Sequence, residues 1–134
     1  MTTIEGGCLC GAVRYGTDAA PTSSVHCHCK MCRQASGAPV VTWISVPRSS
    51  FRFTQGAPVT YPSSPGAERI FCGRCGSPMV FQTDRYPDEL DINVGTLDRP
   101  EDVPPSHHIW TSSRIGWLHL DESLPSHAAF SPQD

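Results

Sequence analysis

Short runs in which apolar and polar residues alternate recur along the 134-residue chain. Gly, Pro and Ser interrupt these runs at intervals of roughly ten residues, which is typical of the strands of a β-sandwich, a barrel or a folded sheet. We therefore expect a mainly β protein. The expected strands cover residues 11–15, 40–46, 51–53, 59–61, 79–81, 90–94, 108–110 and 117–120, and the second and fourth should stop at Pro47 and Pro62.

One stretch has the features of a short helix. Residues 30–35 are followed by Gly37, a residue type that often ends a helix in the left-handed conformation. No longer window carries a sustained apolar stripe of helical spacing. The length suits a single domain over residues 1–134. Residues 126–134 show no pattern, so we expect them to fray.

The charge and the apolar runs exclude two classes of partner. The chain carries 13 acidic and 10 basic side chains, a formal net charge of −3, and has no basic stripe to bind nucleic acid. No apolar run is long enough to cross a membrane. The first residues lack the charged and apolar parts of a secretory signal, so a cytoplasmic location is expected.

The cysteines are the most informative residues, because seven of them fall into three tight groups. The groups are the pair Cys8 and Cys10, the triple Cys27, Cys29 and Cys32, and the pair Cys72 and Cys75. An odd number cannot all form intramolecular disulfides, and the cytosol keeps thiols reduced. A thioredoxin-type redox pair would need a βαβ context that the sequence lacks. The pattern indicates metal sites instead.

Closely spaced thiolates are ligands that zinc prefers, and tight turns let two sulfurs converge on one ion. Seven ligands divide into a closed four-cysteine site and a three-cysteine site with one open position, as catalytic zinc sites have. The simplest partition gives the two pairs to the first ion and the triple to the second. The spacing also permits one structural zinc beside three unrelated buried cysteines.

A histidine could close the second site, and His26 and His28 flank Cys27. In an extended segment, however, alternate residues point to opposite faces, which turns both histidines away from the ion held by their neighbours. Closure by the more distant His107 or His108 is a weaker alternative.

The remaining side chains that could carry chemistry are mostly explained by charge balance, solvation or packing. The basic residues beside the triple, Lys30 and Arg33, would offset thiolate charge, and Arg33 has an equal claim to hold an anionic substrate. The acidic group Asp88, Glu89 and Asp91 is expected to be a solvated loop. The tryptophans, which are Trp43, Trp110 and Trp117, are expected in the core or in a pocket wall.

Several segments together resemble one known family, the glutathione-dependent formaldehyde-activating enzymes, also called the centromere-protein-V-like domain. The segments are residues 6–13 (GGCLCGAV), 26–37 (HCHCKMCRQASG), 71–77 (FCGRCGS), 95–98 (GTLD) and 105–110 (PSHHIW). The resemblance extends over residues 4–125 and includes all seven cysteines. It implies a zinc-stapled β-tent of folded antiparallel sheets with one or two short helices and two zinc ions per chain.

The resemblance also assigns ligands and an activity. It gives Cys8, Cys10, Cys72 and Cys75 to a structural zinc, and Cys27, Cys29 and Cys32 to a catalytic zinc with an open position. It implies a carbon–sulfur lyase that acts on a small-thiol adduct of an aldehyde, such as S-hydroxymethylglutathione. Further expected substrate contacts are Arg33, Ser36 and Gly37.

The hypothesis for the mechanism is that a substrate thiol takes the open position, loses its proton there and attacks a small carbonyl carbon. The alternative is a noncatalytic two-zinc module that binds a protein partner or a small thiol.

Overall fold

The computed structural model describes residues 3–132, which fold into a mainly β protein, as the sequence predicts. The strands are β1 (Ile4–Gly7), β2 (Arg14–Thr17), β3 (Ser23–Cys27), β4 (Val41–Pro47), β5 (Phe51–Gln55), β6 (Val59–Ser64), β7 (Ala67–Phe71), β8 (Pro78–Thr83), β9 (Glu89–Asn93) and β10 (His107–Ile109). The helices are α1 (Lys30–Ser36) and four short 3-10 turns, η1 (Arg48–Ser50), η2 (Val94–Thr96), η3 (Pro100–Asp102) and η4 (Thr111–Ser113). Within this part of the chain, no helix has the length and apolar character needed to cross a membrane.

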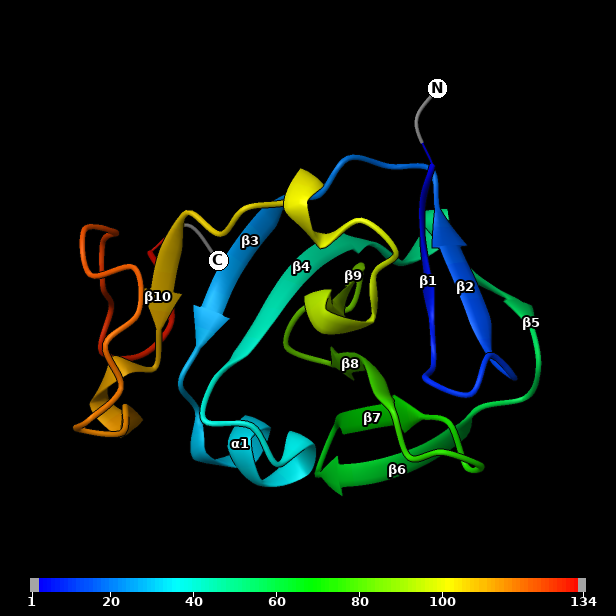
Figure 1. The fold of residues 1–134 in the computed structure, drawn as a ribbon, viewed down its shortest axis with the longest axis horizontal. Helices are drawn as coiled ribbons and strands as arrows, with labels where there is room; N and C mark the ends of the chain where they lie inside the picture. Colours follow the sequence, from blue (N-terminus) through cyan, green and yellow to red (C-terminus); the bar gives the residue numbers. More distant parts are fainter. Residues whose placement is uncertain (1–2, 133–134) are drawn as a thin grey trace.

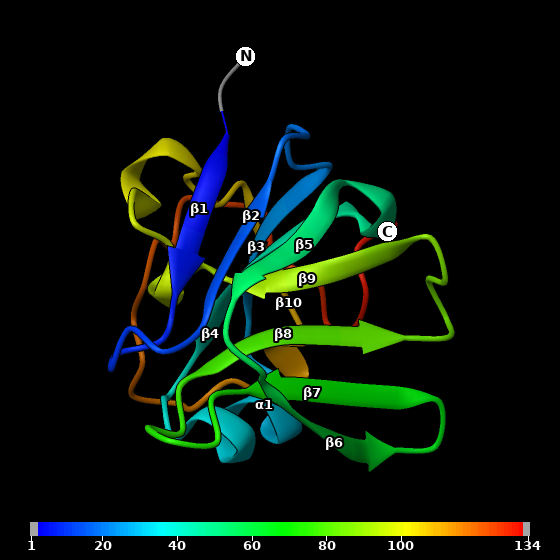
Figure 2. The ribbon, with the colours of Figure 1, turned by 90° about the vertical axis from the view of Figure 1, so that its right-hand side faces the viewer.

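The strands form two sheets (Figure 1). The smaller has the order β1-β2-β5, and the larger has the order β10-β3-β4-β9-β8-β7-β6. Every neighbouring pair is antiparallel except β10 and β3, which are parallel. Strands β6 to β9 follow one another as a meander, which Figure 2 shows beside the smaller sheet.

The main core lies between the two sheets. Side chains alternate across each strand, so Ile44, Ile70, Val80 and Ile92 of the larger sheet all face this core. From the smaller sheet, the fully buried Tyr15 packs among them. A second cluster lies on the opposite face of the larger sheet, and its buried members are Val25, Cys27, Cys32, Val41 and Trp43. The larger sheet therefore separates two apolar layers.

Several strand predictions need correction. The segment 117–120 is not a strand, and Trp117 is 69% exposed. The pattern missed β1, β3 and β7 because their glycines, serines and charged residues hide the alternation, and pairing with neighbouring strands holds them extended. Strand β6 continues past Pro62, because β6 is an edge strand on which a residue without an N–H is tolerated.

The helix prediction holds at both ends. Helix α1 begins directly after Cys29 and ends at Gly37, which has a φ of 72°. The Gly37 N–H donates to the Arg33 carbonyl at 2.7 Å, and the Ser36 hydroxyl donates to the Cys32 carbonyl at 2.8 Å. The first bond satisfies one of the four carbonyls that a helix end leaves without a partner inside the helix, and the second ties the Ser36 side chain to the last turn.

The expectation that residues 126–134 fray is wrong for the described ones. The N–H of His127 donates to the His108 carbonyl at 3.1 Å, and the N–H of Trp110 donates to the Ala129 carbonyl at 3.0 Å. The ring of Phe130 then packs edge-on against Trp110, with centroids 5.0 Å apart. Contacts with β10 and the loop after it hold this segment in place, so it is ordered without a sequence pattern of its own.

Candidate functional site

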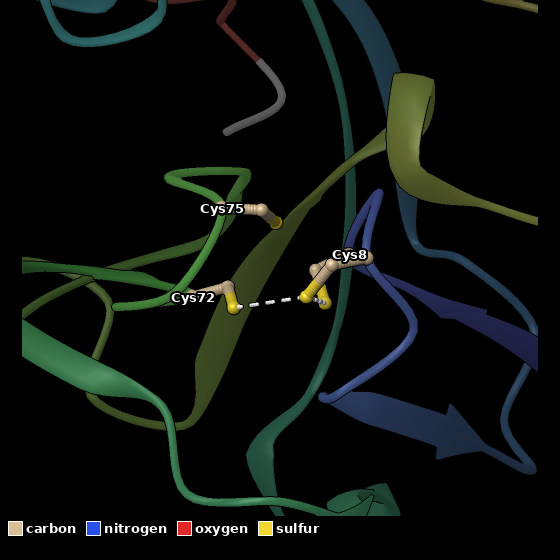
Figure 3. Close-up of side chains that lie close together, drawn as sticks. Cys8, Cys72 and Cys75 are labelled. Atoms are coloured by element: carbon tan, nitrogen blue, oxygen red, sulfur yellow. Dashed lines mark hydrogen bonds between the residues drawn. The ribbon is translucent and has the colours of Figure 1, made fainter.

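The first candidate centre lies where two loops from distant parts of the chain meet. Cys8 and Cys10 belong to the loop between β1 and β2, and Cys72 and Cys75 belong to the loop between β7 and β8. Their four Sγ atoms all lie within 4.8 Å of one another. Figure 3 shows Cys8, Cys72 and Cys75 pointing toward one another from the two loops.

The arrangement of these sulfurs fits a zinc ion. The Sγ atoms of Cys8 and Cys10 are 3.6 Å apart, and those of Cys10 and Cys72 are 3.8 Å apart. Four sulfurs about 2.3 Å from a zinc ion form a tetrahedron whose edges are about 3.8 Å. All four cysteines are free thiols rather than disulfides. Four protein sulfurs would close the coordination shell, which is the pattern of a structural site.

Polar groups around this cluster stabilise the thiolates. The Val13 N–H donates to Cys8 Sγ at 3.2 Å, and the Arg74 N–H donates to Cys72 Sγ at 3.4 Å. The Ser77 hydroxyl lies 3.1 Å from Cys75 Sγ, and its hydrogen bond is the main reason that the pKa of Cys75 is lowered to about 5. Sequence reasoning missed Ser77, although a hydroxyl two residues after the last cysteine of a C-x2-C loop is a signal for this contact.

The cysteine triple lies on the other face of the larger sheet. Cys27 ends β3, Cys29 precedes α1, and Cys32 lies within α1. The Sγ atoms of Cys27 and Cys32 are 3.7 Å apart. Hydrogen bonds from the Cys27 thiol, which has the larger effect, and from the Cys32 thiol lower the pKa of the Cys29 thiol. In residues 3–132, however, only the four-cysteine cluster has every sulfur within 4.8 Å of the others. The triple is thus close together without forming a comparable ligand set.

The two histidines beside the triple contact a third histidine. His28 Nε2 lies 2.9 Å from His108 Nδ1, and the His26 ring centroid is 5.2 Å from that of His108. His26 also contacts Thr42 on β4 and Asp121 of the C-terminal segment, at 2.8 and 2.7 Å. Burial is the main reason that the pKa of His28 is lowered to about 4. These contacts engage both histidines with groups other than the cysteines, in keeping with the alternation expected from the sequence, although the buried Nδ1 of His28 has no hydrogen-bond partner among the described residues.

The triple forms part of the wall of a pocket of about 260 Å³. Most of the other lining groups are apolar or aromatic and come from the second apolar cluster, the meander and the C-terminal segment; they include Trp43, Phe81, Tyr86, Ile109, Trp110 and Phe130. The lining also includes two cations, Arg69 and Arg85, and two acidic residues, Glu89 and Asp91. This is the arrangement of a small-molecule site, with apolar walls and a few placed polar groups.

Three of the pocket residues change the interpretation of the sequence. Asp91 was expected in the strand over residues 90–94 and also as part of a solvated acidic group; it does lie in β9, but on the pocket side, where the Ser45 hydroxyl donates to it at 2.6 Å. Arg69 and Phe130 carry no local signal, because only the pairing of β7 and the docking of the C-terminal segment bring them to the cysteines. The expected role of Trp43 and Trp110 in a pocket wall is confirmed.

The other expected substrate contacts lie on α1 and its end. Ser36 and Gly37 form the hydrogen bonds that end the helix, and the Arg33 side chain has a buried Nε with no partner among the described residues. Arg33, Ser36 and Gly37 are not among the pocket-lining groups. A contact between these residues and a substrate stays a prediction.

The chain is similar to one sequence family and to proteins named after its activity. The sequence family described as "Glutathione-dependent formaldehyde-activating enzyme" matches residues 3–113. A Schizosaccharomyces pombe protein named "Uncharacterized lyase" is 35% identical over 88 residues, which are 60% of this chain and 58% of that protein. The aligned part thus spans somewhat more than half of that relative.

Two further similarities cover more of the chain. A Halomonas elongata protein named "Putative glutathione-dependent formaldehyde-activating enzyme" is 26% identical over 128 residues, which are 88% of this chain and 81% of that protein. A crystal structure of a Rhodobacter sphaeroides protein superposes with a TM-score of 0.59 at 22% identity, over 91% of this chain and 98% of the other. At that identity, the superposition supports the fold alone.

Proposed function

Because the chain belongs to the glutathione-dependent formaldehyde-activating enzyme family, we propose that it forms and cleaves the carbon–sulfur bond between a small thiol and an aldehyde. The adduct is of the type of S-hydroxymethylglutathione. The relatives named as a lyase and as a formaldehyde-activating enzyme support a reaction of this class.

The observation that carries the proposal is the position of the cysteine triple at the pocket. Cys27, Cys29 and Cys32 line a cavity of about 260 Å³, whereas the four-cysteine cluster is not part of its lining. A closed four-thiolate site has no position for a substrate, so the chemistry belongs at the triple. The cavity is a little smaller than a typical ligand pocket of roughly 300–1,000 Å³, which suits a small thiol and a small aldehyde.

We assign two zinc ions to each chain, one held by Cys8, Cys10, Cys72 and Cys75 and one held by Cys27, Cys29 and Cys32. The 3.7 Å separation of Cys27 and Cys32 Sγ is close to the sulfur–sulfur edge of about 3.8 Å in a tetrahedral zinc site, and Cys29 would turn toward this pair to supply the third sulfur. Zinc at the triple would supply a Lewis acid that keeps a substrate thiol ionised at neutral pH.

The residues of the pocket perform the remaining tasks. The aromatic side chains of Trp43, Phe81 and Trp110 bury the organic part of the adduct and keep water from the sulfur. In the forward reaction, the thiolate sulfur attacks the carbonyl carbon, a carbon–sulfur bond forms, and the π electrons move to oxygen, which then takes a proton from solvent water. In reverse, the hydroxyl gives its proton to solvent water, the oxygen electrons re-form the carbonyl π bond, the carbon–sulfur bond breaks, and the electron pair of that bond returns to sulfur. No oxidant or reductant is needed.

The test is exchange NMR of formaldehyde with glutathione, with and without the zinc-loaded protein. We expect the wild type to accelerate exchange and Cys29→Ser to lose the acceleration. Trp117→Ala, which changes an exposed aromatic residue outside the pocket, should behave like the wild type. Zinc is counted in each variant by elemental analysis, with two ions per chain expected in the wild type.

Two results would contradict the proposal. A single zinc per chain would remove the second site. Two zinc ions without acceleration for glutathione, cysteine or other small thiols would favour a noncatalytic two-zinc binding module.

A further inference from the structure

The register of the larger sheet places one arginine on the pocket side next to the cysteine triple. On β7 and β8, Ile70 and Val80 face the main core, so their neighbours Arg69 and Phe81 face the pocket. Arg69 and Phe81 are direct cross-strand partners. Arg69 is half-buried there, although its strand is far from the triple in sequence.

Two contacts fix the guanidinium of Arg69. Its Nη2 donates to Cys32 Sγ at 3.7 Å, and its Cζ lies 4.7 Å from the centroid of the Phe81 ring. Arg69 forms no ion pair with any carboxylate in residues 3–132. A guanidinium has five N–H donors in a fixed fork, so donors besides the one on Cys32 are available to a ligand in the pocket.

The proposed reaction develops negative charge on an oxygen atom, which the N–H donors of Arg69 can stabilise. When a thiolate adds to an aldehyde, negative charge moves from sulfur to the former carbonyl oxygen. Donors placed where that charge develops usually make the largest single contribution to lowering the barrier of such a step. An arginine cannot give up its proton at neutral pH, so it acts here as a fixed donor and not as a general acid.

The position of Arg69 distinguishes it from the other cation in the pocket lining. The guanidinium of Arg85 lies 4.0 Å from the Phe130 ring, donates to the hydroxyl of Tyr86, and is exposed. Arg69, in contrast, contacts the Sγ atom of Cys32 in the triple. The substrate sulfur, at which the carbon–sulfur bond would form, is held at this triple. A substrate sulfur held at the triple places the adjacent carbon and its oxygen one and two bonds away, within reach of that guanidinium.

We propose that Arg69 is a catalytic residue that binds the oxygen of the thiol–aldehyde adduct and stabilises it as the alkoxide. This inference rests on the proposed function. The same contact serves both directions, because the adduct hydroxyl gives its proton to solvent water and becomes the alkoxide, whose electrons re-form the carbonyl π bond as the carbon–sulfur bond breaks. Its electron pair then returns to sulfur, and the regenerated carbonyl oxygen remains hydrogen-bonded to Arg69.

The experiment compares Arg69→Met, Arg69→Lys and the control Arg52→Met, which changes an exposed arginine of β5 outside the pocket. Removing one oxyanion donor typically lowers kcat by about 100- to 1,000-fold, and we expect Arg69→Met to fall in this range. KM should change by less than about threefold, since the contact strengthens only as charge develops. Arg69→Lys keeps the charge without the fork and should retain an intermediate rate, and Arg52→Met should match the wild type.

Added methylguanidinium separates this role from a structural one. It should restore part of the rate of Arg69→Met and leave the wild type unchanged, while the zinc count and the melting temperature of Arg69→Met stay at wild-type values. An Arg69→Met variant with full kcat would overturn the inference and leave the proposed function intact. So would an Arg69→Met variant that loses zinc and recovers full activity on zinc addition, because Arg69 would then only offset thiolate charge.

If Arg69→Met does not fold, Arg69→Lys decides the question. A wild-type kcat in the lysine variant would overturn a role for the guanidinium fork. A wild-type protein that does not accelerate exchange would remove the proposed function and this inference together, and that outcome is recognised before any variant is compared.

Discussion

The Sγ atoms of Cys10 and Cys72 lie 3.8 Å apart, although 62 positions separate the two residues in the chain. Cys10 follows the first strand of the smaller sheet, and Cys72 follows β7 of the larger sheet. The four-cysteine cluster therefore joins the two sheets at one end of the main core. A metal ion there would act as a cross-link between segments that the chain connects only through a long path.

Removal of one ligand from this cluster should weaken that cross-link. Cys10 is exposed, so Cys10→Ser removes a sulfur with little change in packing. We expect the loss of one zinc ion per chain and a fall in melting temperature on the order of 10 °C. Elemental analysis and calorimetry measure the two effects. The control is Leu9→Ala, a change at a neighbouring side chain that is 89% exposed. A Cys10→Ser variant with full zinc and unchanged melting would contradict the assignment.

Ser77 should set the pH at which the same cluster releases its metal. Its hydroxyl contacts Cys75 Sγ at 3.1 Å and accepts the Leu9 N–H at 2.9 Å, so it bridges the two loops. Since the pKa of Cys75 is lowered to about 5, the thiolate's contribution to stability is largest above the ordinary thiol pKa. That contribution declines as the pH falls and is lost near pH 5.

Ser77→Ala should raise the pKa of Cys75 toward its ordinary value and move metal release to higher pH. Loss of such an outer hydrogen bond typically weakens metal binding by about 10- to 100-fold. A colorimetric chelator reports the release between pH 4 and 8. Thr54→Ala removes an exposed hydroxyl on β5 and serves as the control. Identical release curves for Ser77→Ala and the wild type would argue against this role.

Tyr15 should anchor the smaller sheet, through its hydroxyl, to the turn η2 that follows β9 of the larger sheet. The side chain is 1% exposed, and its hydroxyl lies 2.6 Å from Thr96 Oγ1. Because the Thr96 hydroxyl donates to the Asn93 carbonyl, the Tyr15 hydroxyl is the donor in their contact. Tyr15→Phe should lower the free energy of unfolding by about 1–2 kcal/mol. Urea denaturation of the zinc-loaded protein measures the change, and Tyr61→Phe, at a side chain 59% exposed, should change it little.

Phe130 should contribute to substrate binding through the pocket wall. Its ring packs against Trp110 and Tyr86, with centroids 5.0 and 6.1 Å away. Phe130→Ala would open this wall without touching the cysteines. We expect KM to rise by about threefold to tenfold with little change in kcat, since the lost contact serves the bound adduct and the transition state alike. An unchanged KM, or a lower kcat at constant KM, would place Phe130 outside the binding surface.

The sequence of this protein predicts its metal-ligand groups, its turns and the end of its helix. Several features depend only on neighbours within a few residues. They are the three cysteine groups, the turn glycines between and after them, and the cap of α1 at Gly37. The interruptions by Pro and Gly likewise predict a mainly β chain. These features are local because a turn or a cap is decided by the conformations open to a few adjacent residues.

The tertiary structure decided which distant groups meet. Pairing of strands brings Arg69 to Cys32 and places Asp91, which was expected to be solvated, in the lining of a pocket. Docking on β10 and the loop after it places Phe130 beside Trp110, although its segment has no pattern of its own. The sequence determines the ligands and the turns that carry them, because those depend on local conformation. Sheet register and packing determine the pocket, because they are set by burial summed over strands far apart in the chain.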